Sequence, residues 1–108
     1  MTEDQVEDAV KAKGLTGQRV TREQIDGLTQ SMLTLTHRFP GTTCTVAIAV
    51  LPNGFVAGIG KSAAADPANF DAEIGVRVAI DNAHKDARDR LWEMEGYVLK
   101  KAIAAAPQ

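Results

Sequence analysis

Small and aliphatic residues recur at steps of three and four along positions 66–99, which is the spacing of one face of an α-helix. That face consists of Ala72, Val76, Ala79, Ile80, Ala83, Ala87 and Leu91. Because alanine dominates it, we expect this long helix to lie close against a sheet. A second apolar face, made by Phe70, Ile74 and Val78, indicates burial of the first half of the helix between two layers.

The start and the end of this helix carry their own signals. Asp66 and Pro67 open it, because the residue before a proline is pushed out of the helical region and proline fits a first turn. The side chain of Asn69 or Asp71 then caps the free N–H groups. Gly96 predicts a break near the end, followed by a final short helix.

Two shorter helices are predicted near the N-terminus. Residues 2–5 and 21–24 both match the capping-box pattern, in which a threonine is followed three positions later by glutamine. The first helix ends before Gly14. The second is expected to run to about Leu33 and to be followed by a turn at residues 38–41.

A β-hairpin is predicted between these helices and the long one. Residues 42–51 are rich in β-branched side chains and alternate in size, which is typical of a strand. A turn at residues 52–54 leads into a second strand at residues 55–61. Gly58 and Gly60 share one face of that strand, so we expect the alanine-rich helix or a ligand to approach the backbone there.

These elements predict an α+β fold in which an antiparallel β-hairpin packs against one long C-terminal helix, with two short N-terminal helices. Residues 1–108 form a single domain, divided into an N-terminal helical segment (1–36) and the hairpin with the long helix (42–108). An isolated two-stranded hairpin is marginally stable in water, and its open edges and outer face need cover. We therefore expect a homo-oligomer, in which a neighbouring subunit extends the sheet or covers it with helices.

Composition excludes several classes of function. Twelve Lys and Arg against fourteen Asp and Glu give a formal charge of -2, so no net positive field attracts DNA or an anionic membrane. A single cysteine excludes an internal disulfide framework. Without a signal-peptide pattern or a long apolar run, the chain is expected in the cytoplasm.

One polar ridge on the long helix is a candidate binding surface. Arg77, Asp81, His84 and Arg88 follow one another at steps of four, three and four. The two guanidinium groups and the imidazole can hold phosphates. The alternative is a solvated face with internal salt bridges, in which Asp81 pairs with Arg77 or Lys85.

The other candidate groups predict no catalysis. Asp66, Asn69 and Asp71 can bind a ribose hydroxyl or simply cap a helix. Cys44 lies in a strand without a histidine at a telling spacing, and Ser62 has no nucleophile elbow. Two histidines are too few for a metal site. We therefore expect a protein that is not an enzyme and that needs no cofactor or metal.

Several short motifs in the second half of the chain carry a family resemblance. They are Asn53-Gly54-Phe55, Ser62-Ala63, Asp66-Pro67-x-Asn69-Phe70-Asp71-x-Glu73-x-Gly75, Asn82-Ala83 and Leu91-Trp92-x-x-Glu95-Gly96-Tyr97-x-Leu99. Together they resemble the Gp-forty-nine-like family of small tailed-phage proteins. The resemblance implies a phage or prophage protein that works in a bacterial cytoplasm.

The hairpin followed by the Asn-Phe-Asp helix start is also similar, more distantly, to the Thoeris anti-defence sponge proteins. These oligomers sequester cyclic ADP-ribose-type immune signals without cleaving them. The similarity implies a pocket between subunits in which Phe55 stacks on a base and Asn69 and Asp71 bind the ribose or base edges. Arg77 or Arg88 would neutralise phosphate.

A second hypothesis belongs to a different class. The chain can be a phage accessory protein that inhibits or modulates a host protein by direct contact. The apolar surface for that contact would use Phe39, Trp92 and Met94.

Overall fold

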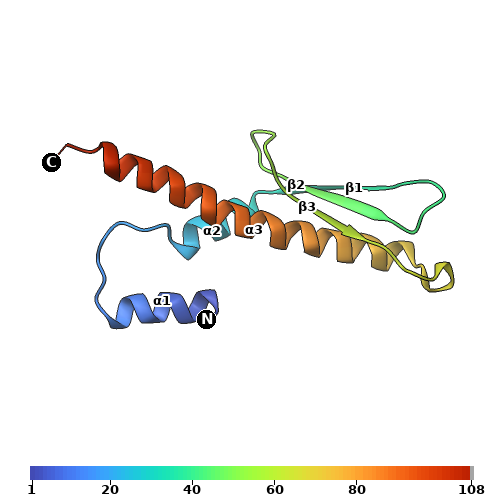
Figure 1. Cartoon of the computed structure of the whole chain (residues 1–108), viewed down its shortest axis with the longest axis horizontal. Coiled ribbons are helices and arrows are strands. Elements are labelled where there is room, and N and C mark those ends of the chain that lie inside the picture. The colour runs from blue at the N-terminus through green and yellow to red at the C-terminus, as the bar shows by residue number, and fades with distance from the viewer. Residues whose placement is uncertain (108) are drawn as a thin grey trace.

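The computed structural model describes residues 1–107, which form three α-helices, one short 3-10 helix and three strands (Figure 1). In chain order these are α1 (Glu3–Ala12), α2 (Arg22–Gln30), β1 (Leu33–Arg38), β2 (Thr45–Val50), β3 (Val56–Ser62), η1 (Pro67–Asn69) and α3 (Ala72–Ala105). The predicted fold class is confirmed, because an antiparallel sheet packs against the long C-terminal helix and two short helices precede it.

The sheet has one strand more than the predicted hairpin. Its order is β1-β2-β3, and both pairs are antiparallel, with Leu35 opposite Ile48 and Ile48 opposite Ile59. The prediction that the second helix reaches Leu33 is wrong, since α2 ends at Gln30 and β1 occupies residues 33–38. Threonine and leucine alternate in this segment, and pairing with β2 outweighs a weak local helix preference.

The alanine face of α3 lies directly on β2 and β3. At Gly58 a Cβ atom would lie 2.7 Å from the Ala87 Cα, and at Gly60 it would lie 2.7 Å from the backbone carbonyl carbon of Asn82. The bare strand face is therefore filled by the helix. The buried core around this contact consists of Ile25, Ala47, Ala49, Ala57, Ala79, Ala83, Ala87 and Leu91.

Helix α3 continues through Gly96 without a break, so the predicted end of the long helix is wrong. No atom lies within 4 Å of a Cβ built at Gly96, and strong helix formers flank it. A single glycine costs about 1 kcal/mol in such a setting, which these neighbours offset. The last turns of α3 extend past the sheet (Figure 1).

The predicted start of the long helix at Asp66 and Pro67 is wrong, because these residues open the separate helix η1 and α3 begins only at Ala72. Asp66 accepts a hydrogen bond from Ala68 N at 2.9 Å and caps η1. Asp71 accepts one from Ile74 N at 2.9 Å and caps α3. Asn69 is the last residue of η1, so its amide does not cap the long helix.

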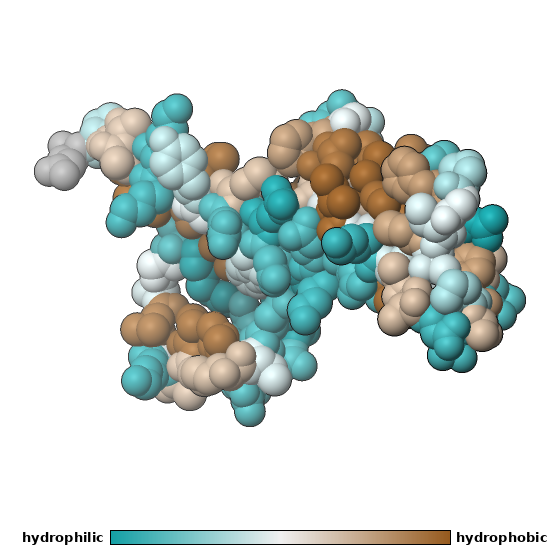
Figure 2. Space-filling model, turned by 45° about the vertical axis from the view of Figure 1, so that its right-hand side comes forward, coloured by the Kyte–Doolittle hydropathy of each residue, from teal (hydrophilic) through white to brown (hydrophobic). Residues whose placement is uncertain are grey.

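The face of the sheet that points away from α3 is apolar and uncovered. Leu33 is 64% exposed, Leu35 is 52% exposed and Ile59 is 55% exposed. Figure 2 shows apolar side chains gathered over this region. The molecule is also extended, since its radius of gyration is 18.0 Å, whereas a compact domain of this length has about 13 Å.

The contact between Gly58 and α3 gives a first prediction. Gly58→Ala should destabilise the fold by about 1–3 kcal/mol, because the new methyl group meets rigid backbone and forces the helix from the sheet. Gly96→Ala is the matched control and should stabilise by about 0.5–1 kcal/mol. Urea unfolding followed by circular dichroism measures both. Equal midpoints for Gly58→Ala and the wild type would contradict the packing.

Candidate functional site

A cleft of about 200 Å³ opens where β3 ends and α3 begins. Hydroxyl, amide, carboxylate and aromatic groups from three segments line it. The lining residues are Thr43, Ser62, Ala63, Ala64, Asn69, Phe70, Asp71, Ile74 and Gly75. The cleft brings together Asn69 and Asp71, two of the five residues predicted to bind a ligand.

Local interactions hold the walls of this cleft. Thr43 Oγ1 donates a hydrogen bond to the Ala64 carbonyl oxygen at 2.7 Å, which ties the loop before β2 to the loop after β3. Gly75 leaves room on α3, since a Cβ atom there would lie 3.3 Å from Thr45 Oγ1 and 3.8 Å from a ring carbon of Phe70. The floor of the cleft therefore depends on a glycine in the first turn of α3.

An aromatic ring and a guanidinium group meet beside the cleft. The Arg38 Cζ atom lies 5.0 Å from the centroid of the Phe70 ring, within the range of a cation–π contact. Register places Arg38 opposite Thr45 and Thr45 opposite Ser62, so these three residues cross the end of the sheet in one row. Sequence reasoning named neither Arg38 nor Phe70 as a ligand-binding residue. Phe70 stands between Asn69 and Asp71 in the motif, which is the signal that could have identified it.

Arg88 was predicted to neutralise a phosphate, but in the structure its guanidinium group binds carboxylates of the same chain. Its Nε donates to Glu3 Oε2 at 2.6 Å, and its Nη2 donates to Glu3 Oε1 at 2.5 Å and to Asp26 Oδ1 at 2.8 Å. A longer bond of 3.4 Å joins Nη1 to Thr29 Oγ1. Arg88 thus links α3 to α1 and α2. These carboxylates raise the pKa of Arg88, and the hydrogen bond from Arg88 lowers the pKa of Glu3.

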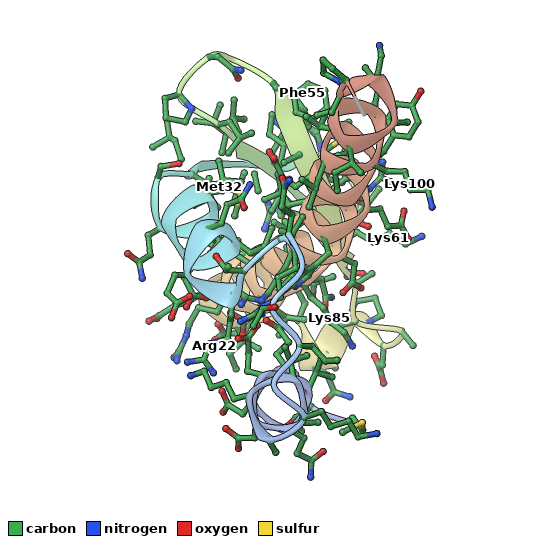
Figure 3. All side chains as sticks on the ribbon, turned by 90° about the vertical axis from the view of Figure 1, so that its left-hand side faces the viewer. Arg22, Met32, Phe55, Lys61, Lys85 and Lys100 are labelled. Atoms are coloured by element: carbon green, nitrogen blue, oxygen red, sulfur yellow. The ribbon has the colours of Figure 1, made fainter. Side chains whose placement is uncertain are left out.

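The other predicted ligand-binding residues, Phe55 and Arg77, do not line the cleft of their own chain. Phe55 is 48% exposed at the turn between β2 and β3, near the end of the sheet away from the cleft (Figure 3). The seven residues of β3 separate it from the cleft by roughly 20 Å. Arg77 and Asp81 are exposed on α3, and within residues 1–107 no ion pair joins Asp81 to Arg77 or Lys85.

The groups in the cleft are suited to binding by stacking and hydrogen bonding. Asp71 already accepts a bond from Ile74 N, so its carboxylate is held at the helix start.

Cys44 is half-buried just before β2 and does not line the cleft. Over residues 1–107, the structure has no group of three or more His, Cys, Asp or Glu placed to hold a metal ion. The same residues include no helix with the length and apolarity to cross a bilayer.

Helix α1 is held mainly by charged side chains. None of residues 3–12 is buried, and Figures 1 and 3 show α1 set apart from the sheet and α3. Its ion pairs are Glu3 with Arg88, Asp4 with Arg22 and Glu7 with Arg19. Met1 and Val6 also line a hollow together with Trp92 of α3.

This attachment gives a second prediction. Because the pKa of Glu3 is lowered in the folded state, its contribution is fully present above the ordinary glutamate pKa of about 4.5 and is lost as the pH falls through the folded value. Glu3→Gln at pH 7 should lower the hydrogen-exchange protection of residues 3–12 roughly two- to fivefold, since exposed pairs are worth little.

Arg90→Gln is the matched control for that experiment. It removes the exposed pair between Arg90 and Asp86 within α3 and should leave the protection of α1 unchanged. Unchanged protection of α1 in Glu3→Gln would show that the ion pair does not hold this helix.

Comparison with known proteins places the chain in a family. No protein of curated function and no solved structure matches the chain. A family model does match it, over residues 1–103, and that model describes the phage protein (N4 Gp49/phage Sf6 gene 66) family. The match spans α1, the sheet and nearly all of α3. The chain therefore belongs to the phage protein (N4 Gp49/phage Sf6 gene 66) family.

Proposed function

We propose that this phage protein is a non-enzymatic anti-defence protein that binds and sequesters a cyclic nucleotide immune signal of the cyclic ADP-ribose type. The observation that carries the proposal is the cleft beside α3, which joins Asn69 to the aromatic ring of Phe70 with Arg38 next to it. Such groups recognise a base, a ribose and a phosphate without activating a nucleophile. The distant similarity to the Thoeris sponge proteins, which is an expectation from the sequence motifs alone, would imply the same class of ligand.

Each group has a role that its chemistry suits. The Phe70 ring offers a stacking surface for a base, and the Asn69 amide can both donate and accept at a base edge or ribose. The Ser62 hydroxyl can donate or accept a further hydrogen bond, and Thr43 Oγ1, whose hydrogen is donated to Ala64, can accept one. Arg38 is exposed and forms no ion pair with any of residues 1–107, so its charge is available to a phosphate.

The size of the cleft favours a site completed by a second subunit. Pockets that enclose a drug-sized ligand have about 300–1,000 Å³, and this cleft has about 200 Å³. One chain would therefore enclose only part of a cyclic dinucleotide-sized ligand. In a homo-oligomer, Phe55 or Arg77 of a neighbouring subunit would complete the pocket, whereas Arg88 stays paired with carboxylates of its own chain.

A second candidate function is direct inhibition of a host protein. The uncovered apolar face of the sheet favours it, because faces of this kind mark protein interaction sites. Phe39 is 49% exposed at the end of this face, whereas Trp92 and Met94 are half-buried against the core. Only the first of the three aromatic or apolar residues predicted for that contact is thus free to make it.

The ligand proposal gives a third prediction. The wild-type protein, purified from bacteria with an active nucleotide-based defence, should carry an extra mass of a few hundred daltons per site in native mass spectrometry. Added cyclic ADP-ribose isomers should raise its melting temperature. Asn69→Ala and Arg38→Gln should each weaken binding about tenfold or more in titration calorimetry, because the first removes a hydrogen-bonding amide and the second removes the positive charge that would face phosphate.

Arg90→Gln is the control for charge, since Arg90 lies on α3 outside the cleft. It should bind as the wild type does. A wild-type protein that carries no small molecule and ignores a panel of cyclic nucleotides would overturn the proposal. Equal loss of binding in Arg90→Gln and Arg38→Gln would assign the effect to net charge and remove the cleft from the argument.

A further inference from the structure

The two faces of the sheet carry side chains of very different size. Toward α3 the strands present mainly alanine, glycine and threonine, which the close helix contact requires. Register places three rows on the opposite face. The rows are Leu33–Val50–Val56, Leu35–Ile48–Ile59 and His37–Val46–Lys61.

The large aliphatic side chains of the sheet are therefore on its open face. Ile25 and Leu91 are the largest aliphatic side chains buried within residues 1–107, and neither belongs to a strand. Leu33, Leu35, Val56 and Ile59 are each at least 42% exposed. An apolar face of this kind resembles a domain core that has been cut in half, which is characteristic of permanent interfaces.

We propose that this open face is the interface of a homodimer, in which two copies pack their sheets face to face. The inference deepens the homo-oligomer on which the proposed function rests, because it names the surface that joins the subunits. Two rows of uncharged aliphatic residues are complementary to their own copy, and two-fold dimers use such a surface. The extended shape, with a radius of gyration of 18.0 Å, fits a subunit that completes its core by association.

The edges of the sheet favour a face contact over continued strand pairing at β3. Ile59 N on that edge donates to Asp86 Oδ2 at 2.9 Å, and the Lys61 carbonyl oxygen accepts from Asn82 Nδ2 at 3.0 Å. Side chains of α3 thus occupy backbone groups that another strand would need. Natural sheets use such cover to prevent edge pairing.

The size and charge of the face indicate how the copies are oriented. Three strands of about six residues give a footprint of roughly 15 by 20 Å. A stable interface buries about 800 Å² per partner, so the face alone is too small and exposed flanking residues such as Phe39 and Phe55 would have to contribute. His37 and Lys61 lie in one row at one end. Opposed strand directions place the Lys61 ammonium groups of the two copies apart, whereas aligned directions bring them together.

A second copy fits this surface better than a host protein does. The face is permanently exposed in a lone subunit, and long uncovered apolar sheets aggregate in water. Further copies of the chain are made together with the first, so a second copy can cover the face before a host protein is encountered. The central row of Leu35, Ile48 and Ile59 carries no charge or hydrogen-bonding group that would select a different partner.

The fourth prediction tests this interface by light scattering after size exclusion. The wild type should have twice the mass of the 11.5 kDa chain, or an even multiple of it. Leu35→Lys should halve that mass while keeping the helical circular dichroism spectrum. Val98→Lys is the matched control, because Val98 is 61% exposed on α3 and lies off the sheet. It should keep the wild-type mass.

Cross-linking keeps the test valid if Leu35→Lys fails to fold. In a Cys44→Ser background, Ile48→Cys at the centre of the face should give a covalent dimer with a short bismaleimide, whereas Val98→Cys should give none. A monodisperse wild-type monomer at micromolar concentration would overturn the proposal, as would failure of Ile48→Cys to cross-link.

The same variants separate this inference from the nucleotide proposal. Titration of wild-type protein with cyclic ADP-ribose isomers reports on the cleft, and the mass reports on the sheet face. A wild-type dimer that binds no nucleotide supports the interface and removes the ligand. A wild-type monomer that binds nucleotide removes the interface and leaves the cleft.

Discussion

The close approach of α3 to β2 and β3 is the constraint on which the rest of the structure depends. Gly58 and Gly60 allow the helix backbone to lie where side chains would normally stand, and the alanines at 79, 83 and 87 make the opposing surface equally flat. Such contact gains dispersion energy from many short-range atom pairs but buries little apolar area for each residue. Close packing of small side chains therefore holds the helix on the sheet more than the burial of large apolar side chains does. Replacement of a single hydrogen by a methyl group at this contact displaces rigid backbone.

This choice of small residues has a consequence for the opposite face of the sheet. Side chains alternate along a strand, so a face made of alanine and glycine leaves the leucines, isoleucines and valines on the other side. A chain of 108 residues has little core to spare, and here its largest strand side chains contribute nothing to it. The uncovered apolar face thus has its origin in the small residues that the contact with α3 requires.

The sequence was most informative where a pattern and a boundary signal agreed. The alanine repeat predicted α3, and Asp71 caps it as its position suggested. The segment that forms β1 carries two conflicting signals. The capping box before α2 predicts a helix that continues into it, whereas its threonines favour a strand. Only pairing with β2, a contact distant in the sequence, decided the outcome. Gly96 shows the reverse case. A local helix breaker was overruled by the strong helix formers around it.

The candidate site shows the same limit of local pattern. Asn69 and Asp71 were identified because they lie two positions apart in the motif at the start of the helix, and the cleft contains both. Arg88 was chosen for its place on a polar ridge, but a ridge position does not reveal which elements will pack over it. Glu3 and Asp26 come from helices about sixty and more residues away and already neutralise its charge. To bind Arg88, a phosphate would have to displace two carboxylates and release α1. To bind Arg38, it would approach a guanidinium group that contacts the aromatic ring of Phe70. Charge that is already paired gives little binding energy to a new anion, so Arg38 beside Phe70 is better suited than Arg88 to the phosphate of the proposed ligand.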